Sequence, residues 1–137
     1  MKRTKNPAKE AEYRKRAADL VAQMTLHEKV SQMLSWAPAI ERLGIPAYNW
    51  WSEGIHGIGR AGTATVFPQA IGMAAAFDED MMEQVGNAVG VEARGKYNMC
   101  RAHGDRDIIK GLTVWAPNIN IFRDPRWGRG HETYGEE

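Results

Sequence analysis

Leu112-Thr113-Val114-Trp115-Ala116 is a compact run of β-branched and aromatic residues that stops at a proline, and it predicts a strand over 112–116. A segment with Asp78 as its N-cap and apolar residues on one face precedes it and predicts a helix over about 79–97. Further upstream, the aromatic run 47–51 follows a turn with glycine and proline and predicts another strand. Strand, helix and strand without hairpin signals between them indicate a parallel α/β arrangement, in which active sites collect at the C-terminal ends of the strands.

Two more helices are expected before the first strand. Apolar residues recur at helical spacing over about 11–24, and a second helix over about 26–34 begins at Thr25, which forms a capping-box pattern with Glu28. The residues expected to face inward are Val30, Met33 and Leu34 in the helix over 26–34, and Met81, Met82, Val85, Val89 and Ala93 in the helix over 79–97.

The composition and net charge of the chain argue against several classes of partner. The 137 residues are 43% hydrophobic and 26% charged, which suits one soluble globular domain with a core. A formal net charge of +1 gives no electrostatic field strong enough to attract nucleic acid or a membrane surface. The longest nearly uncharged segment, residues 61–77, is interrupted by glycine and proline and is not expected to span a membrane. Residues 1–12 are expected to be a basic N-terminal tail with no signal-peptide core after it, so a cytoplasmic location is expected.

Cysteine and histidine usage gives no sign of a disulfide, metal or cofactor. Cys100 is the single cysteine and is expected to be a structural free thiol. The four histidines lack zinc-like spacing, and the carboxylates form no calcium-loop pattern. We therefore expect neither a metal ion nor a cofactor.

The first chemical cluster follows the strand over 47–51 and reads Trp50-Trp51-Ser52-Glu53-Gly54-Ile55-His56-Gly57. Two tryptophans beside a carboxylate and an imidazole offer an apolar face for a pyranose ring and hydrogen-bond partners for its hydroxyls. Adjacent side chains on a strand point to opposite faces, so at least one of the two tryptophans is expected in the core. His56 is either a structural histidine or part of the site lining. Glu53 is interpreted as functional, because a carboxylate among aromatic rings is costly to desolvate.

The second cluster follows the strand over 112–116 and sets five charged residues within ten positions. Arg123, Asp124 and Arg126 are expected to pair structurally with neighbouring charges. Arg129 stands between two glycines and can project from a tight turn, where its guanidinium suits vicinal sugar hydroxyls or a carboxylate.

Three ordered motifs then resemble a known family. They are Trp-Ser-Glu-Gly-Ile-His-Gly at 51–57, Phe-Pro-Gln-Ala-Ile-Gly-Met-Ala-Ala-Ala-Phe-Asp at 67–78, and Ala-Pro-Asn-Ile-Asn-Ile-Phe-Arg-Asp-Pro-Arg-Trp-Gly-Arg-Gly-His-Glu-Thr-Tyr-Gly-Glu at 116–136. Together they closely resemble the amino-terminal domain of glycoside hydrolase family 3, and the resemblance covers about residues 13–137. Three motifs in order are far more specific than one short pattern.

The resemblance implies a (β/α)8 TIM-like barrel and an enzyme that removes terminal β-linked sugars, xylosyl or glucosyl, with retention of configuration. Such a barrel needs about 250 residues, so this chain is expected to be its first, incomplete part. An open sheet edge and uncovered apolar helix faces are then expected. The family's nucleophile and acid/base have no counterpart here, so no catalytic residue is expected in this chain.

Individual roles follow from the resemblance. Arg129 and Glu53 match substrate-binding positions, while Trp51, His56 and Glu132 are supporting residues, with Glu132 orienting Arg129. The motif around Glu53 favours xylosidases over glucosidases. The resemblance also argues against a general acid/base pair made of Glu53 and Glu132.

Three function hypotheses result. In the first, the chain is a piece of a β-glycosidase for an oligosaccharide or aryl glycoside, inactive alone and possibly completed by the missing C-terminal part of the barrel. In the second, it is a non-catalytic half-barrel that binds sugar weakly or pairs with a separately encoded remainder. In the third, it is a nucleic-acid binder, a hypothesis that is supported only by the four basic residues of the N-terminal tail. The particular sugar and linkage stay open.

Overall fold

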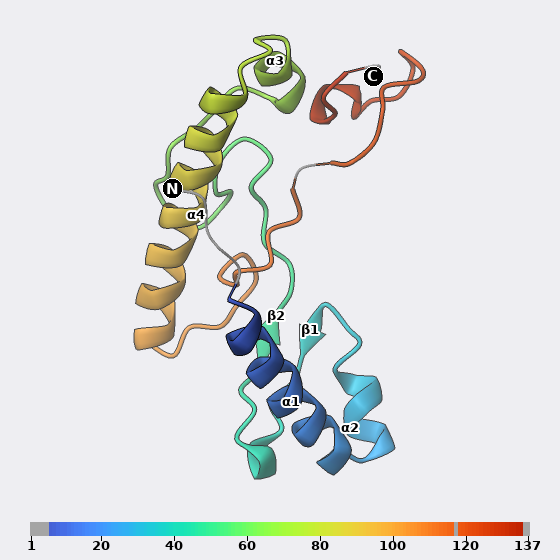
Figure 1. Ribbon diagram of the computed structural model, residues 1–137, viewed down its shortest axis with the longest axis vertical. Coiled ribbons are helices and arrows are strands. Elements are labelled where there is room, and N and C mark those ends of the chain that lie inside the picture. The colour runs from blue at the N-terminus through green and yellow to red at the C-terminus, as the bar shows by residue number, and fades with distance from the viewer. Residues whose placement is uncertain (1–5, 117, 136–137) are drawn as a thin grey trace. The chain divides into compact units, whose positions relative to one another are not determined.

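The structure is a computed structural model that describes residues 6–116 and 118–135 (Figure 1). The chain splits into two compact units, Met1–Ala47 and Tyr48–Glu137. The first unit contains α1 (Pro7–Gln23), α2 (Leu26–Ser31), β1 (Trp36–Ala37) and the short 3-10 helix η1 (Glu41–Leu43). The second contains β2 (Tyr48–Asn49), α3 (Ala70–Ala74), α4 (Glu79–Ala102) and the 3-10 helix η2 (Gly130–Glu132).

Helix α1 begins four residues earlier than the sequence pattern predicts. The Asn6 side chain accepts hydrogen bonds from the backbone N–H groups of Ala8 and Lys9 at 3.1 and 3.3 Å, and Pro7 occupies the first helical position. Both features favour a helix start. Part of the expected basic tail is therefore helical, residues 1–5 of it lie outside the described residues, and the boundary at residue 13 stays a prediction.

The capping box at the start of α2 is confirmed. The Glu28 N–H donates to Thr25 Oγ1 at 3.2 Å, and the Thr25 N–H donates to Glu28 Oε2 at 2.8 Å. Arg42 also donates to Glu28, with Nε 2.8 Å from Oε1. This hydrogen bond, followed by that from the Thr25 backbone, lowers the pKa of Glu28 from its ordinary value of 4.5 to about 2.

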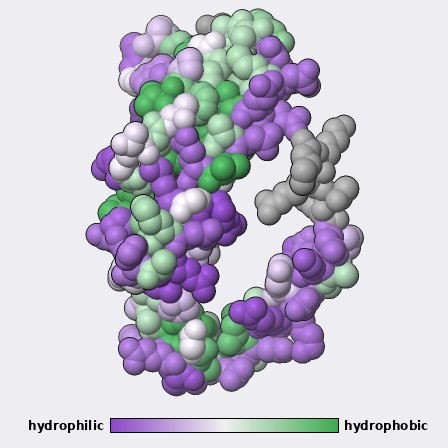
Figure 2. All heavy atoms as spheres, turned by 90° about the vertical axis from the view of Figure 1, so that its left-hand side faces the viewer, coloured by the Kyte–Doolittle hydropathy of each residue, from purple (hydrophilic) through white to green (hydrophobic). Residues whose placement is uncertain are grey.

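The prediction that Val30, Met33 and Leu34 face inward is wrong. Val30, Met33 and Leu34 are 56%, 83% and 64% exposed, and the helix already ends at Ser31. A helical period fixes which residues share a face, but burial needs a partner surface, and no described segment covers these three side chains. Other large apolar residues, including Phe77 and Val91, are also exposed, and hydrophobic residues lie at the surface among hydrophilic ones in Figure 2.

The two predicted strands of the second unit run parallel, as expected, but form almost no regular ladder. Ser52 and Val114 make a parallel bridge, and the Trp115 N–H donates to the Ser52 carbonyl at 2.8 Å. The predicted strand over 47–51 reduces to β2, and 112–116 keeps only the bridge. Tyr48 gives a physical reason. Its hydroxyl oxygen accepts the N–H groups of Leu112 and Thr113 at 2.7 and 3.1 Å, so a side chain replaces the neighbouring strand there.

A glycine allows this close approach. An ideal Cβ at Gly111 would lie 2.6 Å from the Asn49 carbonyl oxygen, a distance that real Cβ atoms do not show. The absence of a side chain at 111 therefore lets the two parallel segments meet and brings their C-terminal ends to the same place.

Helix α4 carries the face that the sequence predicts. Asp78 Oδ1 accepts the Met81 N–H at 2.9 Å as N-cap, and the helix runs to Ala102, five residues beyond expectation. Ala93 is buried, and the other expected residues of this face, Met81, Met82, Val85 and Val89, are partly buried. The prediction of an apolar face is confirmed.

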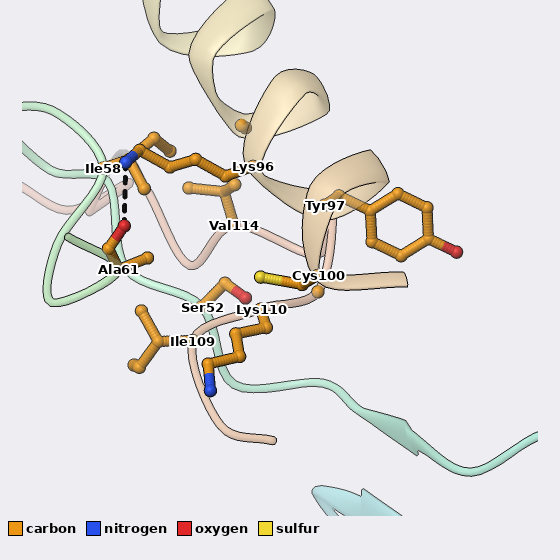
Figure 3. A pocket seen from close by; sticks show the side chains of 11 residues that line it. Ser52, Ile58, Ala61, Lys96, Tyr97, Cys100, Ile109, Lys110 and Val114 are labelled. Carbon is orange, nitrogen blue, oxygen red and sulfur yellow. Dashed lines mark hydrogen bonds between the residues drawn. The ribbon is translucent and has the colours of Figure 1, made fainter. Parts of the chain in front are cut away.

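A small cavity of about 10 Å³ lies between α4 and the two parallel segments (Figure 3). Its lining includes Ser52, which is 3% exposed, the half-buried Cys100 and the buried Ile109. Ligand pockets for small molecules are typically about 300–1,000 Å³. The cavity is thus far too small for a sugar, and the candidate site lies elsewhere. No helix among the described residues is long and apolar enough to cross a membrane.

Candidate functional site

The C-terminal ends of the two parallel segments bring three tryptophans together. The Trp51 and Trp115 rings stack with centroids 5.1 Å apart and planes 14° apart, and Trp115 Nε1 donates to the Trp50 carbonyl at 2.6 Å. Trp50, Trp51 and Trp115 are 44%, 41% and 56% exposed. The expectation that Trp50 or Trp51 lies in the core is therefore wrong. Asn49 explains this: its Oδ1 accepts the Trp51 N–H at 2.9 Å, so the chain turns there and strand alternation no longer applies.

Glu53 lies directly beside this aromatic pair. Its Oε1 accepts a hydrogen bond from Arg60 Nη2 at 2.6 Å and another from Trp51 Nε1 at 3.3 Å. The Arg60 hydrogen bond is the main cause that lowers the pKa of Glu53, with partial burial acting in the opposite direction. Glu53 is therefore an ionised acceptor at neutral pH, suited to binding hydroxyl groups.

His56 makes a structural contact. Its Nδ1 lies 3.2 Å from the Phe67 carbonyl oxygen, so the tautomer with a proton on Nδ1 donates to it, and the Phe67 N–H donates back to the His56 carbonyl at 2.7 Å. These bonds join the two ends of the loop 56–67 that follows Glu53. Of the two interpretations of His56, this contact favours the structural one, and its supporting role in the site stays a prediction.

Arg129 and Glu132 form a bidentate ion pair. Arg129 Nε donates to Glu132 Oε1 at 2.9 Å, and Arg129 Nη2 donates to Glu132 Oε2 at 2.5 Å. The pairing lowers the pKa of Glu132, mainly through the hydrogen bond from Arg129. The Arg129 side chain is 69% exposed, so its remaining N–H groups are accessible. This is the contact expected of a carboxylate that orients Arg129, although binding of substrate by Arg129 stays a prediction.

The other charges of the second cluster pair locally. Arg126 Nη2 donates to Asp124 Oδ2 at 2.6 Å, which agrees with the expected structural pairing. Arg123 instead donates to the amide oxygen of Asn120 at 2.5 Å. Arg126 is 89% exposed, which makes it a useful control for Arg129.

The structure brings the two sequence clusters near each other. The charge of Glu132 acts to raise the pKa of Glu53, against the larger lowering by Arg60, so the two carboxylates sense one another electrostatically. A general acid at neutral pH needs a raised pKa, whereas the pKa values of both carboxylates are lowered. Their chemistry is that of charged acceptors. Among the described residues, no group of three or more His, Cys, Asp and Glu side chains could hold a metal ion.

Sequence reasoning missed Trp115 and Arg60 as parts of this site. The signal for Trp115 was available, because parallel strands ending at Trp51 and Trp115 place both rings at one edge. Arg60 had no such signal. It reaches Glu53 only because the loop between them folds back, with the Gly59 N–H donating to the Glu53 carbonyl at 3.0 Å.

Two parallel segments that end in exposed aromatic rings and arginine-paired carboxylates make up the candidate site. In a comparison with protein families, residues 15–137 match the glycosyl hydrolase family 3 N terminal domain. The chain belongs to this family.

Similar proteins include probable beta-D-xylosidase 7 of Arabidopsis thaliana, 51% identical over 133 residues, and the xylan 1,4-beta-xylosidase of Xylanibacter ruminicola, 48% identical over 126 residues. Each match covers 90% of this chain but only 16% and 15% of the relative. Among solved structures, a family 3 exo-beta-xylosidase, XlnD, in complex with a xylobiose aziridine probe aligns with a TM-score of 0.73 and 34% identity. That alignment covers 98% of this chain and 17% of XlnD.

Proposed function

We propose that this chain is the amino-terminal, sugar-binding part of a retaining β-glycosidase that acts on terminal β-xylosyl groups. The observation that carries the proposal is the cluster of Trp51, Trp115 and Glu53 at the ends of two parallel segments. Exposed indole rings suit the apolar face of a pyranose, and an ionised carboxylate beside them suits its hydroxyls. The similar proteins are described as β-xylosidases, which supports the choice of xylose.

In this proposal, Glu53 and Arg129 bind hydroxyls of the terminal sugar. Glu53 accepts hydrogen bonds, and Arg129, held by Glu132, donates them. Trp51 supports Glu53 through its Nε1, and His56 supports the loop that follows. The scaffold is the first part of a (β/α)8 barrel, and further chain completes it. The exposed apolar residues of the second unit, such as Val91 on α4, support a surface that other segments cover.

The nucleophile and the general acid/base lie outside these 137 residues in our proposal. The lowered pKa values of Glu53 and Glu132 support this for the general acid/base, because neither carboxyl group is a proton donor at neutral pH. The placement of the nucleophile rests on the family resemblance alone. The chain alone is then expected to bind the sugar without cleaving it.

A chimera tests the proposal. The chain replaces the matching segment of the Xylanibacter ruminicola xylan 1,4-beta-xylosidase, and release of p-nitrophenol from its β-D-xylopyranoside is measured. Glu53→Gln and Arg129→Met are each expected to lower kcat/KM about 10-fold or more, because a hydrogen bond to a charged group contributes roughly 1.5–3 kcal/mol.

Arg126→Met is the matched control, because Arg126 belongs to the same loop and pairs only with Asp124 among the described residues. The proposal fails if Arg126→Met and Arg129→Met lower kcat/KM equally, or if the chimera prefers the aryl β-glucopyranoside to the xyloside. Rapid p-nitrophenol release by the 137-residue chain alone would contradict the placement of the catalytic carboxylates.

A further inference from the structure

The two carboxylate oxygens of Glu53 have different surroundings. Oε1 accepts both protein hydrogen bonds, from Arg60 Nη2 at 2.6 Å and from Trp51 Nε1 at 3.3 Å. Oε2 accepts none from the residues that the structure describes, and its near neighbour is the backbone of Gly59, where an ideal Cβ would lie 3.4 Å from it. A carboxylate held through one oxygen keeps the lone pairs of the other available to accept further hydrogen bonds.

The backbone of Arg60 is held in an unusual conformation. Its φ is +54°, in the left-handed region that few residues other than glycine adopt. Hydrogen bonds fix the chain on both sides of it: the Gly59 N–H donates to the Glu53 carbonyl at 3.0 Å, and Lys96 of α4 donates to the Ala61 carbonyl at 2.7 Å. Lys96 also donates to the Thr63 carbonyl at 2.5 Å. A long helix therefore supports the turn that aims Arg60 at Glu53.

We propose that Arg60 is a positioning residue for Glu53. The Arg60 guanidinium binds Oε1 of Glu53 and thereby directs Oε2 toward a sugar hydroxyl. This inference rests on the proposed function for its ligand, a xylosyl group, but the contact between Arg60 and Glu53 is independent of it. Arg60 does not itself touch the sugar. It acts by fixing the orientation and the negative charge of Glu53.

The test uses the 137-residue chain and follows the carboxyl carbon of Glu53 by NMR as the pH changes. Arg60→Gly keeps the left-handed backbone available and removes the guanidinium, whereas Arg60→Lys keeps the charge and removes the planar fork. We expect Arg60→Gly to raise the pKa of Glu53 toward its ordinary value and Arg60→Lys to raise it less. Arg126→Met is the control and should leave the Glu53 titration unchanged, because its partner is Asp124.

Titration with xylose provides the second readout. Arg60→Gly should weaken xylose binding about two- to fivefold, the range for loss of a solvent-exposed ion pair, while the unfolding midpoint stays within the error of the wild type. An unchanged Glu53 titration in Arg60→Gly overturns the inference. So does an unchanged xylose affinity in Arg60→Gly when Glu53→Gln weakens it. A wild-type chain that binds no xylose contradicts the proposed function, and the Glu53 titration alone then decides the role of Arg60.

Discussion

Replacing Gly130 by alanine tests how tightly the loop that carries Arg129 is packed. An ideal Cβ at Gly130 would lie 1.9 Å from Phe122 Cε2 and 2.3 Å from Phe122 Cδ2, far inside any allowed contact. The backbone of Phe122 is anchored in this loop, because its N–H donates to the Gly135 carbonyl at 2.8 Å, and Thr133 of the same loop is fully buried. At Gly128, two residues earlier, the same Cβ meets nothing within 4 Å.

The expected changes in stability follow from the surroundings of Gly130 and Gly128. Overpacking of a close contact costs about 1–3 kcal/mol, so Gly130→Ala should lower the free energy of unfolding by that amount. Neither glycine has a positive φ, so alanine is compatible with both backbones. Gly128→Ala should therefore be neutral or stabilise the chain by up to about 1 kcal/mol, through the lower entropy of its unfolded state.

Urea unfolding of the wild type and of each variant measures both effects. Phe122→Ala removes the ring that the new methyl group meets, so the cost of Gly130→Ala should fall below about 0.5 kcal/mol in that background, which is a coupling energy typical of contacting residues. Equal costs for Gly130→Ala and Gly128→Ala would refute the packing argument. An equal cost of Gly130→Ala with and without Phe122 would refute it as well.

Three further predictions concern single side chains. Thr133→Val should lower the free energy of unfolding by about 1–3 kcal/mol in urea titrations, because it removes the hydroxyl that donates to a buried carbonyl at 2.7 Å, whereas Thr133→Ser should cost less. The lowered pKa of Glu28 stabilises the folded state fully at pH values above the ordinary pKa of 4.5, and this stabilisation is lost as the pH falls toward about 2. Circular dichroism should therefore show a loss of helix between these pH values, and Glu28→Gln should remove this pH dependence. Trp115→Ala should abolish the exciton couplet that the stacked indoles of Trp115 and Trp51 give in circular dichroism; a retained couplet would show that the stack does not form.

Local signals were the most predictable from sequence. The capping box of Thr25 and Glu28 and the N-cap Asp78 form as expected, because each involves atoms within three residues along the chain. The parallel pairing of the two segments at Ser52 and Val114 was also predictable, since strands joined through a helix run parallel and end at the same edge. The family resemblance, carried by three motifs, is confirmed over residues 15–137.

Burial and side-chain partners were less predictable. The apolar spacing of Val30 and Met33 predicts an inward face, yet both side chains are exposed. A helical period shows which residues share a face of a helix, but not whether another segment packs against that face. The ladder expected at 112–116 is missing because the Tyr48 hydroxyl, 64 residues away, takes the N–H of Leu112.

The sequence by itself determined the family, the starts of α2 and α4, the parallel order and the residue types of the site, since these depend on short-range spacing and on motifs that can be read directly. Only the tertiary structure decided that Trp51 stacks on Trp115, that Arg60 holds one oxygen of Glu53, and that both Trp50 and Trp51 are exposed. The physical reason is that these contacts arise where the chain turns back on itself. There, a carboxylate binds the donor that the fold brings nearest, which no spacing along the chain specifies.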